Sequence, residues 1–440
     1  MQGENAVLNV VRWSLWGVAL GLLVVVGVWT LSRLMPMPAA QREALALLRP
    51  AAVAPPPGGN AFDGIWLLGF DDVPDAERAA IIAEDVQRLA DLPGDAPFTP
   101  SATASVAQLR YREVADATLP CRWRQADCLA LVRANPAAVE AALVGQRGLL
   151  TRINALSGDS HYRSRFVADG RLPIPSFNLL QRSLSAHALA HVQGRSDEAL
   201  AGICSDVRTA KVLMSHGDGL VPANIGAAMV GGNVRLLASV LAELPVAHPL
   251  PATCEGVFVA PAPQALSLCP AMQGEFAMVS GSLEITPVGF GWLALDKQKT
   301  EGLLALSMAG ACSQRTVDAL AADIPVHWSH ASSSTWRLEC AANAVGCIVA
   351  GISGPAYDNY GSSLQDAGAR LRLAEALLWL RANPHVDAAA ALAQVPARLR
   401  EGARPLLLGN DGASLQVASY YGKDNGAAFS VPLPGTAVRQ

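Results

Sequence analysis

The sequence predicts a mainly α-helical protein with a single N-terminal transmembrane helix, a body of packed helical hairpins and a small C-terminal β-hairpin or meander. Three observations predict this fold class. A long apolar run lies near the N-terminus, amphipathic helix patterns follow it, and short apolar stretches separated by Gly and Asn follow Pro405. The chain has 440 residues, which is long enough to bury a substantial core behind the anchor.

The apolar run covers residues 13–32 and contains no charged side chain. Twenty helical residues span about 30 Å, the thickness of a hydrocarbon core. Trp13 and Trp16 lie near one end and Trp29 near the other, where indole rings suit the membrane interfaces. Small residues at positions 38–40 leave a cleaved signal peptide as the alternative, but its apolar core is only about 7–15 residues long. The length favours a retained anchor.

The charges beside the anchor do not decide its orientation, because Arg12 precedes it and Arg33, Arg42 and Arg49 follow it. The even number of cysteines, eight, is a better indicator. Scattered cysteines behind an export segment favour disulfides in an oxidising compartment. We therefore expect residues 1–12 in the cytoplasm and the bulk of the chain in a periplasm, attached to a bacterial inner membrane by a single pass.

All eight cysteines are disulfide candidates, because the short Cys-x(2–4)-Cys pairs of zinc sites and the redox CxxC motif are missing from the sequence. Seven residues of continuous helix rise about 10 Å, so a bridge within either close pair needs a broken helix. Pro120 makes such a break plausible for the first pair, whereas helix-favouring alanines make it doubtful for the last. The other pairings stay open. The candidates are Cys121, Cys128, Cys204, Cys254, Cys269, Cys312, Cys340 and Cys347.

Local composition predicts the order of the regions. Residues 33–60 form a Pro- and Ala-rich linker that contains a short helix over residues 41–48. A helical domain covers residues 61–250, and a second helical region covers residues 251–404. Residues 405–440 form a short β-rich segment.

Helices are expected wherever apolar residues recur at helical spacing. The sequence RANP occurs twice, and each time we expect the Asn to cap a helix and the Pro to take its first position. The stretch GRSDEAL after residue 193 resembles the turn of a tetratricopeptide-type helical hairpin, which implies helices packed on helices. Residues 61–73 are expected to be a strand or a buried loop. The expected helices cover residues 75–92, 177–193, 196–216, 223–244 and 362–382, together with the segments after residues 135 and 383.

Two histidine pairs have spacings that metal ligands can use. His187 and His191 lie four residues apart on an expected helix, but Ala188 replaces the Glu of an HExxH metalloprotease. His327 and His330 lack an identifiable third ligand in the sequence. We therefore expect no metal and no cofactor, and a hydrogen-bonded helix face at the first pair.

The sequence GDSH at residues 158–161 resembles the nucleophile block of GDS-type esterases, which implies Ser160 as a nucleophile and a later Asp-x-x-His block. Two departures weigh against this family. The segment before the motif has a helical pattern where the family has a strand, and Asp323 and His327 have one residue too many between them. GISGP at residues 351–355 departs from the GxSxG elbow as well, because Pro replaces the last Gly.

Two classes of function remain. Nucleic acid is not an expected partner, because the net charge is −4 and no basic stripe interleaved with aromatics runs along the sequence. We expect a membrane-anchored extracytoplasmic protein-binding or scaffold module that engages another envelope protein, as an envelope-complex component or a toxin inhibitor. The alternative is an envelope hydrolase whose site folding assembles from Asp159, Ser160, His161 and His327.

Overall fold

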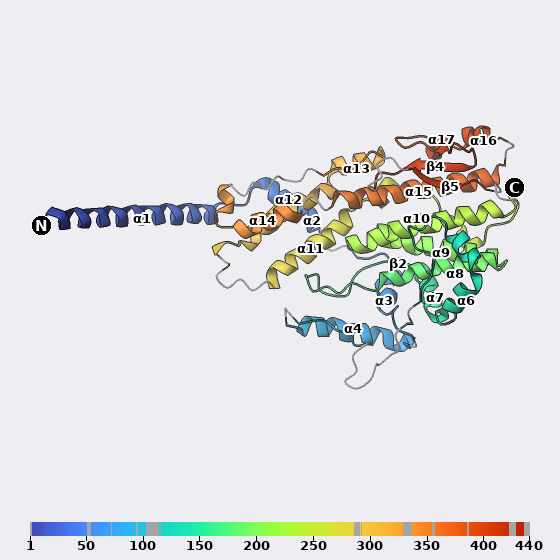
Figure 1. Cartoon of the computed structure of the whole chain (residues 1–440), viewed down its shortest axis with the longest axis horizontal. Coiled ribbons are helices and arrows are strands. Elements are labelled where there is room, and N and C mark those ends of the chain that lie inside the picture. Colours follow the sequence, from blue (N-terminus) through green and yellow to red (C-terminus); the bar gives the residue numbers. More distant parts are fainter. Residues whose placement is uncertain are drawn as a thin grey trace. The chain divides into compact units, whose positions relative to one another are not determined.

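The computed structural model confirms the predicted fold class, because the chain is mainly α-helical and carries a small antiparallel sheet near its C-terminus (Figure 1). Contacts divide the chain into two compact units. Unit 1 comprises Met1–Pro50, Leu283–Gly310 and Trp328–Ala356, and unit 2 comprises Ala51–Ser282, Ala311–His327 and Tyr357–Gln440. The structure describes residues 2–50, 54–71, 73–93, 96–102, 114–115, 117–285, 291, 293–328, 337–353, 357–384, 387–421 and 428–434.

Unit 1 contains the N-terminal helix and a small helical cluster. α12 packs against both α2 and α14. Two glycines allow these close contacts, since a Cβ at Gly302 would lie 2.5 Å from Gln41 Oε1 and one at Gly346 would lie 1.9 Å from Thr300 Oγ1. The elements are α1 (Gln2–Leu34), α2 (Ala39–Leu48), α12 (Lys297–Met308), the 3₁₀ turn η7 (Leu338–Cys340) and α14 (Ala344–Ser353).

α1 is long and apolar enough to cross a membrane over Val11–Leu34, a stretch of 24 residues with a mean hydropathy of 2.1 and no buried share. One further helix among the described residues, α10 (Leu220–Glu243), passes the same test of length and hydropathy. It is 78% buried inside unit 2 and is a core helix of that unit. α1 alone therefore has the exposed apolar surface that a membrane helix needs.

The core of unit 2 is built from four helices that pack in sequence. α8 (Arg182–Val192) packs on α9 (Ser196–Ser215), α9 on α10, and α10 on α15 (Asp358–Ala382). Gly194 forms the turn between α8 and α9 with a φ of +80°, a conformation that favours glycine. The long helices predicted from periodicity are thus confirmed, and they provide the rigid elements of the candidate site.

Shorter helices complete unit 2, and α11 also continues into unit 1. First in the chain are α3 (Ala61–Trp66), α4 (Asp75–Asp91), α5 (Cys128–Ala134), α6 (Pro136–Val144) and α7 (Arg147–Ala155). Later come α11 (Cys269–Ile285), α13 (Gln314–Ala321), α16 (Ala388–Gln394) and α17 (Ala397–Arg400). The 3₁₀ turns are η1 (Leu156–Gly158), η2 (Phe177–Gln181), η3 (Ala252–Cys254) and η4 (Pro263–Leu266), with η6 (Ala309–Cys312) at the border of the units.

The predicted C-terminal meander is confirmed as the antiparallel sheet β3 (Leu407–Leu408), β4 (Ser414–Ala418) and β5 (Ala428–Pro432). The sheet buries alternate residues of β4 and β5, as a half-buried sheet should. β4 contacts α15 and β5 contacts α10, so the sheet covers these two helices. A second, parallel pairing joins β1 (Gly59–Asn60) to β2 (Asp159–His161).

Two local predictions are wrong. The segment after Asn60 forms helix α3 instead of a strand or loop, because the Asn60 side chain caps it by accepting from the Phe62 amide. The first RANP behaves as predicted, with Asn135 capping α6. In the second RANP, Asn383 ends α15 and donates to the Trp379 carbonyl, while Asp387 caps α16. Asp387, which directly precedes α16, therefore caps this helix in place of Asn383.

The eight cysteines form four disulfides, Cys121–Cys128, Cys204–Cys254, Cys269–Cys312 and Cys340–Cys347. The doubt about a bridge within the last pair is wrong. Cys340 ends a 3₁₀ turn and α14 begins only at Ala344, so the Cα atoms of the pair come within 5.9 Å. Four disulfides indicate an oxidising, extracytoplasmic compartment. The predicted region boundaries near residues 60, 250 and 404 stay predictions.

Removing the Cys204–Cys254 bridge should destabilise unit 2 more than removing Cys121–Cys128. The first closes a loop of 50 residues and the second one of 7, which correspond to about 4 and about 2 kcal/mol of chain entropy. Urea unfolding of the two double alanine variants checks this order. Both variants lose buried sulfur atoms from the same unit, so equal losses would mean that loop length does not decide the effect.

Candidate functional site

A cleft of about 820 Å³ opens in unit 2 between α10, α15, the C-terminal sheet and the loop before α5. No Asp or Glu is found among the described residues that line it. We call it the basic cleft after the side chains that set its character. They are Arg124, Arg235 and Arg370, with the aromatic residues Trp123, Tyr360, Tyr421 and Phe429.

The first disulfide builds one wall of the basic cleft. Cys121–Cys128 closes the loop that carries Trp123 and Arg124, and the Cys121 amide donates to Ser185 Oγ of α8 at 3.2 Å. The loop lies directly on α10, because a Cβ at Gly232 would come within 2.9 Å of the Trp123 Cα. The disulfide therefore presents two cleft residues from a rigid loop.

Two arginines lie against one aromatic ring in the cleft. The guanidinium carbons of Arg235, from α10, and Arg370, from α15, lie 4.5 and 4.9 Å from the centre of the Phe429 ring. Arg235 Nη1 donates to the Trp123 carbonyl at 3.1 Å. Gly231 leaves room for Arg370, since a Cβ there would lie 3.1 Å from Arg370 Nη1. Both charges are thus held against the same ring, and among the described residues only Arg370 has an ion-pair partner, Asp366.

The two arginine charges oppose each other in a poorly solvated place. Burial, and then the charge of Arg370, lower the pKa of Arg235 to about 10. Burial also lowers the pKa of Arg370, and Arg404 and Arg124 add to this, while Asp366 acts against it from 3.8 Å. Arg370 Nε is buried and has no hydrogen-bond partner in the described part of the chain. An anion in the cleft would relieve the repulsion between the two guanidinium groups.

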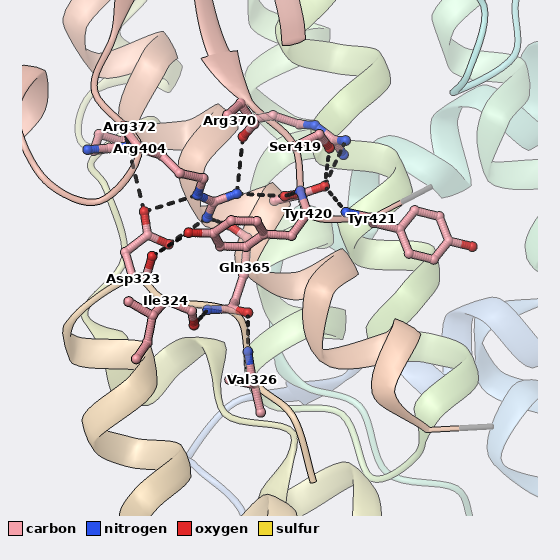
Figure 2. A network of polar contacts seen from close by, with 12 residues as sticks. Asp323, Ile324, Val326, Gln365, Arg370, Arg372, Arg404, Ser419, Tyr420 and Tyr421 are labelled. Carbon is pink, nitrogen blue, oxygen red and sulfur yellow. Dashed lines mark hydrogen bonds and ion pairs between the residues drawn. The ribbon is translucent and has the colours of Figure 1, made fainter. Parts of the chain in front are cut away.

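A buried carboxylate fixes the wall that carries Tyr421 (Figure 2). Asp366 accepts hydrogen bonds from the amides of Tyr420 and Tyr421, at 2.8 and 3.0 Å, and from the Ser419 hydroxyl. It also accepts from Arg404 Nη1 at 2.6 Å. Asp366 also forms an ion pair with Arg370, whose Nη2 lies 3.8 Å away, and its charge raises the pKa of Arg370 against the effect of burial.

Arg404 holds this network together, and its side chain is only 2% exposed. Its Nε and Nη2 donate to the two oxygens of Asp323 at 3.1 and 2.5 Å, while the other donors reach Asp366 and two backbone carbonyls. All five guanidinium N–H groups are therefore satisfied. The guanidinium also stacks on the Tyr420 ring, 3.9 Å from its centre, as Figure 2 shows.

The residues of the hydrolase alternative come together only in part. Ser160 Oγ lies 3.0 Å from His161 Nδ1 on β2, and Asp159 precedes them. Burial, and then Asp63, raise the pKa of Asp159, whereas burial and nearby arginines lower the pKa of His161. Among the described residues no carboxylate is hydrogen-bonded to His161. A triad therefore lacks its acid among the described residues. His327 is exposed and makes no hydrogen bond to Ser160, His161 or Asp159.

Both histidines of the pair on α8 are hydrogen-bonded to other side chains of the protein. His187 Nε2 lies 3.2 Å from Asp206, while His191 contacts Ser196 at 2.9 Å and Glu243 at 3.0 Å. Each imidazole thus has its own partners. In the part of the chain that the structure covers, no group of three or more His, Cys, Asp or Glu could hold a metal ion. His330 lies outside the described residues.

Replacing Ser160 with alanine tests the catalytic alternative. We expect the variant to match the wild type in a broad esterase screen, because Ser160 Oγ also donates to the Gly59 carbonyl and no carboxylate of the described residues is hydrogen-bonded to His161. The screen is read with short acyl esters at neutral pH. His161→Ala serves as a second variant, and loss of an existing hydrolytic activity in both would support the hydrolase.

The basic cleft was not predicted from the sequence. Its residues come from segments as far apart as Trp123 and Phe429, and no local motif joins them. One signal was present: two adjacent glycines inside a long apolar helix, followed by Arg235. Glycine weakens a helix interior, so a Gly pair there indicates close approach by another group.

No family model matches this sequence, and neither a curated protein nor a solved structure matches the chain.

Proposed function

We propose that this chain is a membrane-anchored extracytoplasmic binding module, which uses the basic cleft to hold an acidic segment of another envelope protein. In this proposal α1 crosses a bacterial inner membrane once, the first residues lie in the cytoplasm and both units lie in the periplasm. The apolar helix supports the anchor and the disulfides support an oxidising compartment. An envelope-complex component is the version that this site favours.

One observation carries the proposal. Arg235 and Arg370 lie against the same ring in a cleft whose described lining has no carboxylate, and Arg370 Nε has no partner among the described residues. Burial and the charge of Arg370 lower the pKa of Arg235, so the Arg235 charge weakens the folded protein unless something compensates it. A bound carboxylate supplies that compensation, and a guanidinium can bind it through two parallel hydrogen bonds.

The aromatic lining favours a peptide segment over a small inorganic anion. Trp123, Tyr360 and Tyr421 provide apolar surface next to the arginines, and aromatic and Arg side chains are enriched at protein–protein binding sites. A cleft of about 820 Å³ also has room for several side chains. The ligand that fits this surface is a short segment with carboxylates beside apolar or aromatic groups.

Photocrosslinking in the native membrane tests the proposal. p-Benzoylphenylalanine replaces Tyr421, whose ring is about one-third exposed at the cleft, in the full-length protein. After irradiation in the producing cells, mass spectrometry identifies the captured peptide. We expect one protein, captured through an Asp- or Glu-rich segment, and loss of the crosslink in the Arg235→Gln/Arg370→Gln background.

Two results would contradict the proposal. The first is a crosslink that persists unchanged when both arginines are replaced, since the charges would then play no part in binding. The second is capture of segments without acidic residues. The same probe at Leu407, an exposed residue of β3 outside the cleft lining, controls for random capture.

A further inference from the structure

α14 exposes an entirely aliphatic face. Val345, Ile348, Val349 and Ile352 follow helical spacing and are 38–75% exposed, while the opposite side is buried and includes Cys347. The helix sequence AVGCIVAGIS contains no charged residue. A surface helix of a soluble protein normally places polar residues on its outer face. The outer face of α14 therefore suits an apolar environment.

The start of α14 is fixed to the end of the apolar span. Trp29 Nε1, inside the span, donates to the Leu293 carbonyl at 2.7 Å. The next carbonyl, of Ala294, accepts from the Val345 amide at 3.0 Å. Ser32, which is fully buried, accepts through Oγ from the Ala342 amide at 3.0 Å. Figure 1 shows α14 beside the C-terminal end of α1.

Helix geometry gives the depth of these contacts in the membrane. The span Val11–Leu34 is about 36 Å long and a hydrocarbon core is about 30 Å thick. With the span centred, Trp29 lies about 5 Å inside the edge of the core. Val345, two hydrogen bonds away, then starts at the membrane interface. Even if α14 ran straight outward, Ile352 would be only about 10 Å further out, near the edge of the headgroups.

The Cys340–Cys347 disulfide also fixes the position of α14 within unit 1. It ties the first turns of α14 to η7, the turn that leads into the Ser32 contact. On the buried side, Gly346 lets α14 lie directly on Thr300 of α12. The aliphatic face therefore has one fixed orientation relative to α1, instead of the freedom of an exposed loop.

We infer that the aliphatic face of α14, with the exposed Leu293 and Leu338 beside it, rests in the lipid interface of the membrane that α1 spans. The occupant is phospholipid, and unit 1 rests on the membrane surface beside the point where α1 leaves the membrane. This inference depends on the proposed anchoring by α1 but not on the ligand of the basic cleft.

Lipid crosslinking of the full-length protein in phospholipid vesicles tests the inference. p-Benzoylphenylalanine replaces Ile348, and Ile352 provides a second probe on the same face. We expect roughly fivefold more phospholipid adduct at either position than at Leu407, an exposed aliphatic residue of unit 2. Flotation of the same vesicles in alkaline carbonate reports independently whether α1 anchors the chain.

The outcomes separate the two claims. Protein that floats but gives no more lipid adduct at Ile348 and Ile352 than at Leu407 overturns the inference and leaves the anchor intact. A crosslinked dimer in place of the lipid adduct overturns it as well, because a second copy would then cover the face. Protein that does not float refutes the anchoring by α1, and the inference falls with it.

Discussion

Replacing Arg404 with alanine lowers the free energy of unfolding of unit 2 by about 3–5 kcal/mol, the typical cost of breaking a buried ion pair. The side chain is almost fully buried, and its loss leaves Asp366 without its closest charged partner. Among the described residues, Asp323 then keeps one charged partner, Arg372, whose guanidinium lies 3.7 Å away. Urea unfolding followed by circular dichroism measures the effect.

Arg398→Ala is the matched control. Arg398 also pairs with a carboxylate, Glu375, at 2.6 Å, but its side chain is 63% exposed. An exposed pair contributes only about 0–1 kcal/mol. Arg404→Lys should fall between the two, because a lysine cannot reach both carboxylates with paired donors. Similar losses for Arg404→Ala and Arg398→Ala would show that the network does not hold unit 2 together.

Replacing Arg235 with glutamine should weaken the binding of an acidic peptide at least about tenfold, which corresponds to about 1.4 kcal/mol. The same change should cost far less stability than Arg404→Ala, because it removes a charge that Arg370 repels. Hexaglutamate is a suitable probe, and fluorescence anisotropy at fixed ionic strength measures its affinity. Arg398→Gln, outside the cleft lining, is expected to leave the affinity unchanged.

The pH dependence of this binding has a definite sign. Burial lowers the pKa of Arg235 in the folded protein to about 10, below its usual value. The unfolded chain therefore holds the proton more tightly, so the Arg235 charge opposes folding at neutral pH. This penalty begins to fade as the pH rises above about 10 and is lost at the higher pKa of the unfolded chain. Peptide affinity should fall over the same range as Arg235 loses its charge. Affinity that is constant through this range would contradict the role given to Arg235.

The sequence predicted the elements whose signals are local. Periodicity identified α4 and α9, and the Gly- and Asn-rich breaks identified the C-terminal meander. It failed where a competing cap decided the outcome, as Asp387 did at α16. It also failed at Cys340–Cys347, because the start of α14 within one turn decides whether that bridge can form.

The basic cleft could not be predicted, because its charge arises from tertiary contacts. In the sequence, Arg235 and Arg370 resemble the solvated charges of ordinary amphipathic helices. Only folding shows that both are half-buried against Phe429 and that Asp366 accepts hydrogen bonds from Arg404 and from backbone amides. The search for a basic stripe interleaved with aromatics covered only residues that are neighbours along the chain. The cleft instead brings together residues about 300 positions apart.

Photoaffinity mapping tests the central claim most directly. Full-length protein is irradiated with hexaglutamate that carries a diazirine, and the labelled residues are identified by mass spectrometry. The account predicts saturable labelling of the basic cleft, at Trp123, Tyr360, Tyr421 or Phe429, and its loss in the Arg235→Gln/Arg370→Gln variant. Labelling outside the cleft, or labelling that survives in this variant, would contradict the account. So would labelling that a single-stranded oligonucleotide suppresses at a lower concentration than free hexaglutamate does.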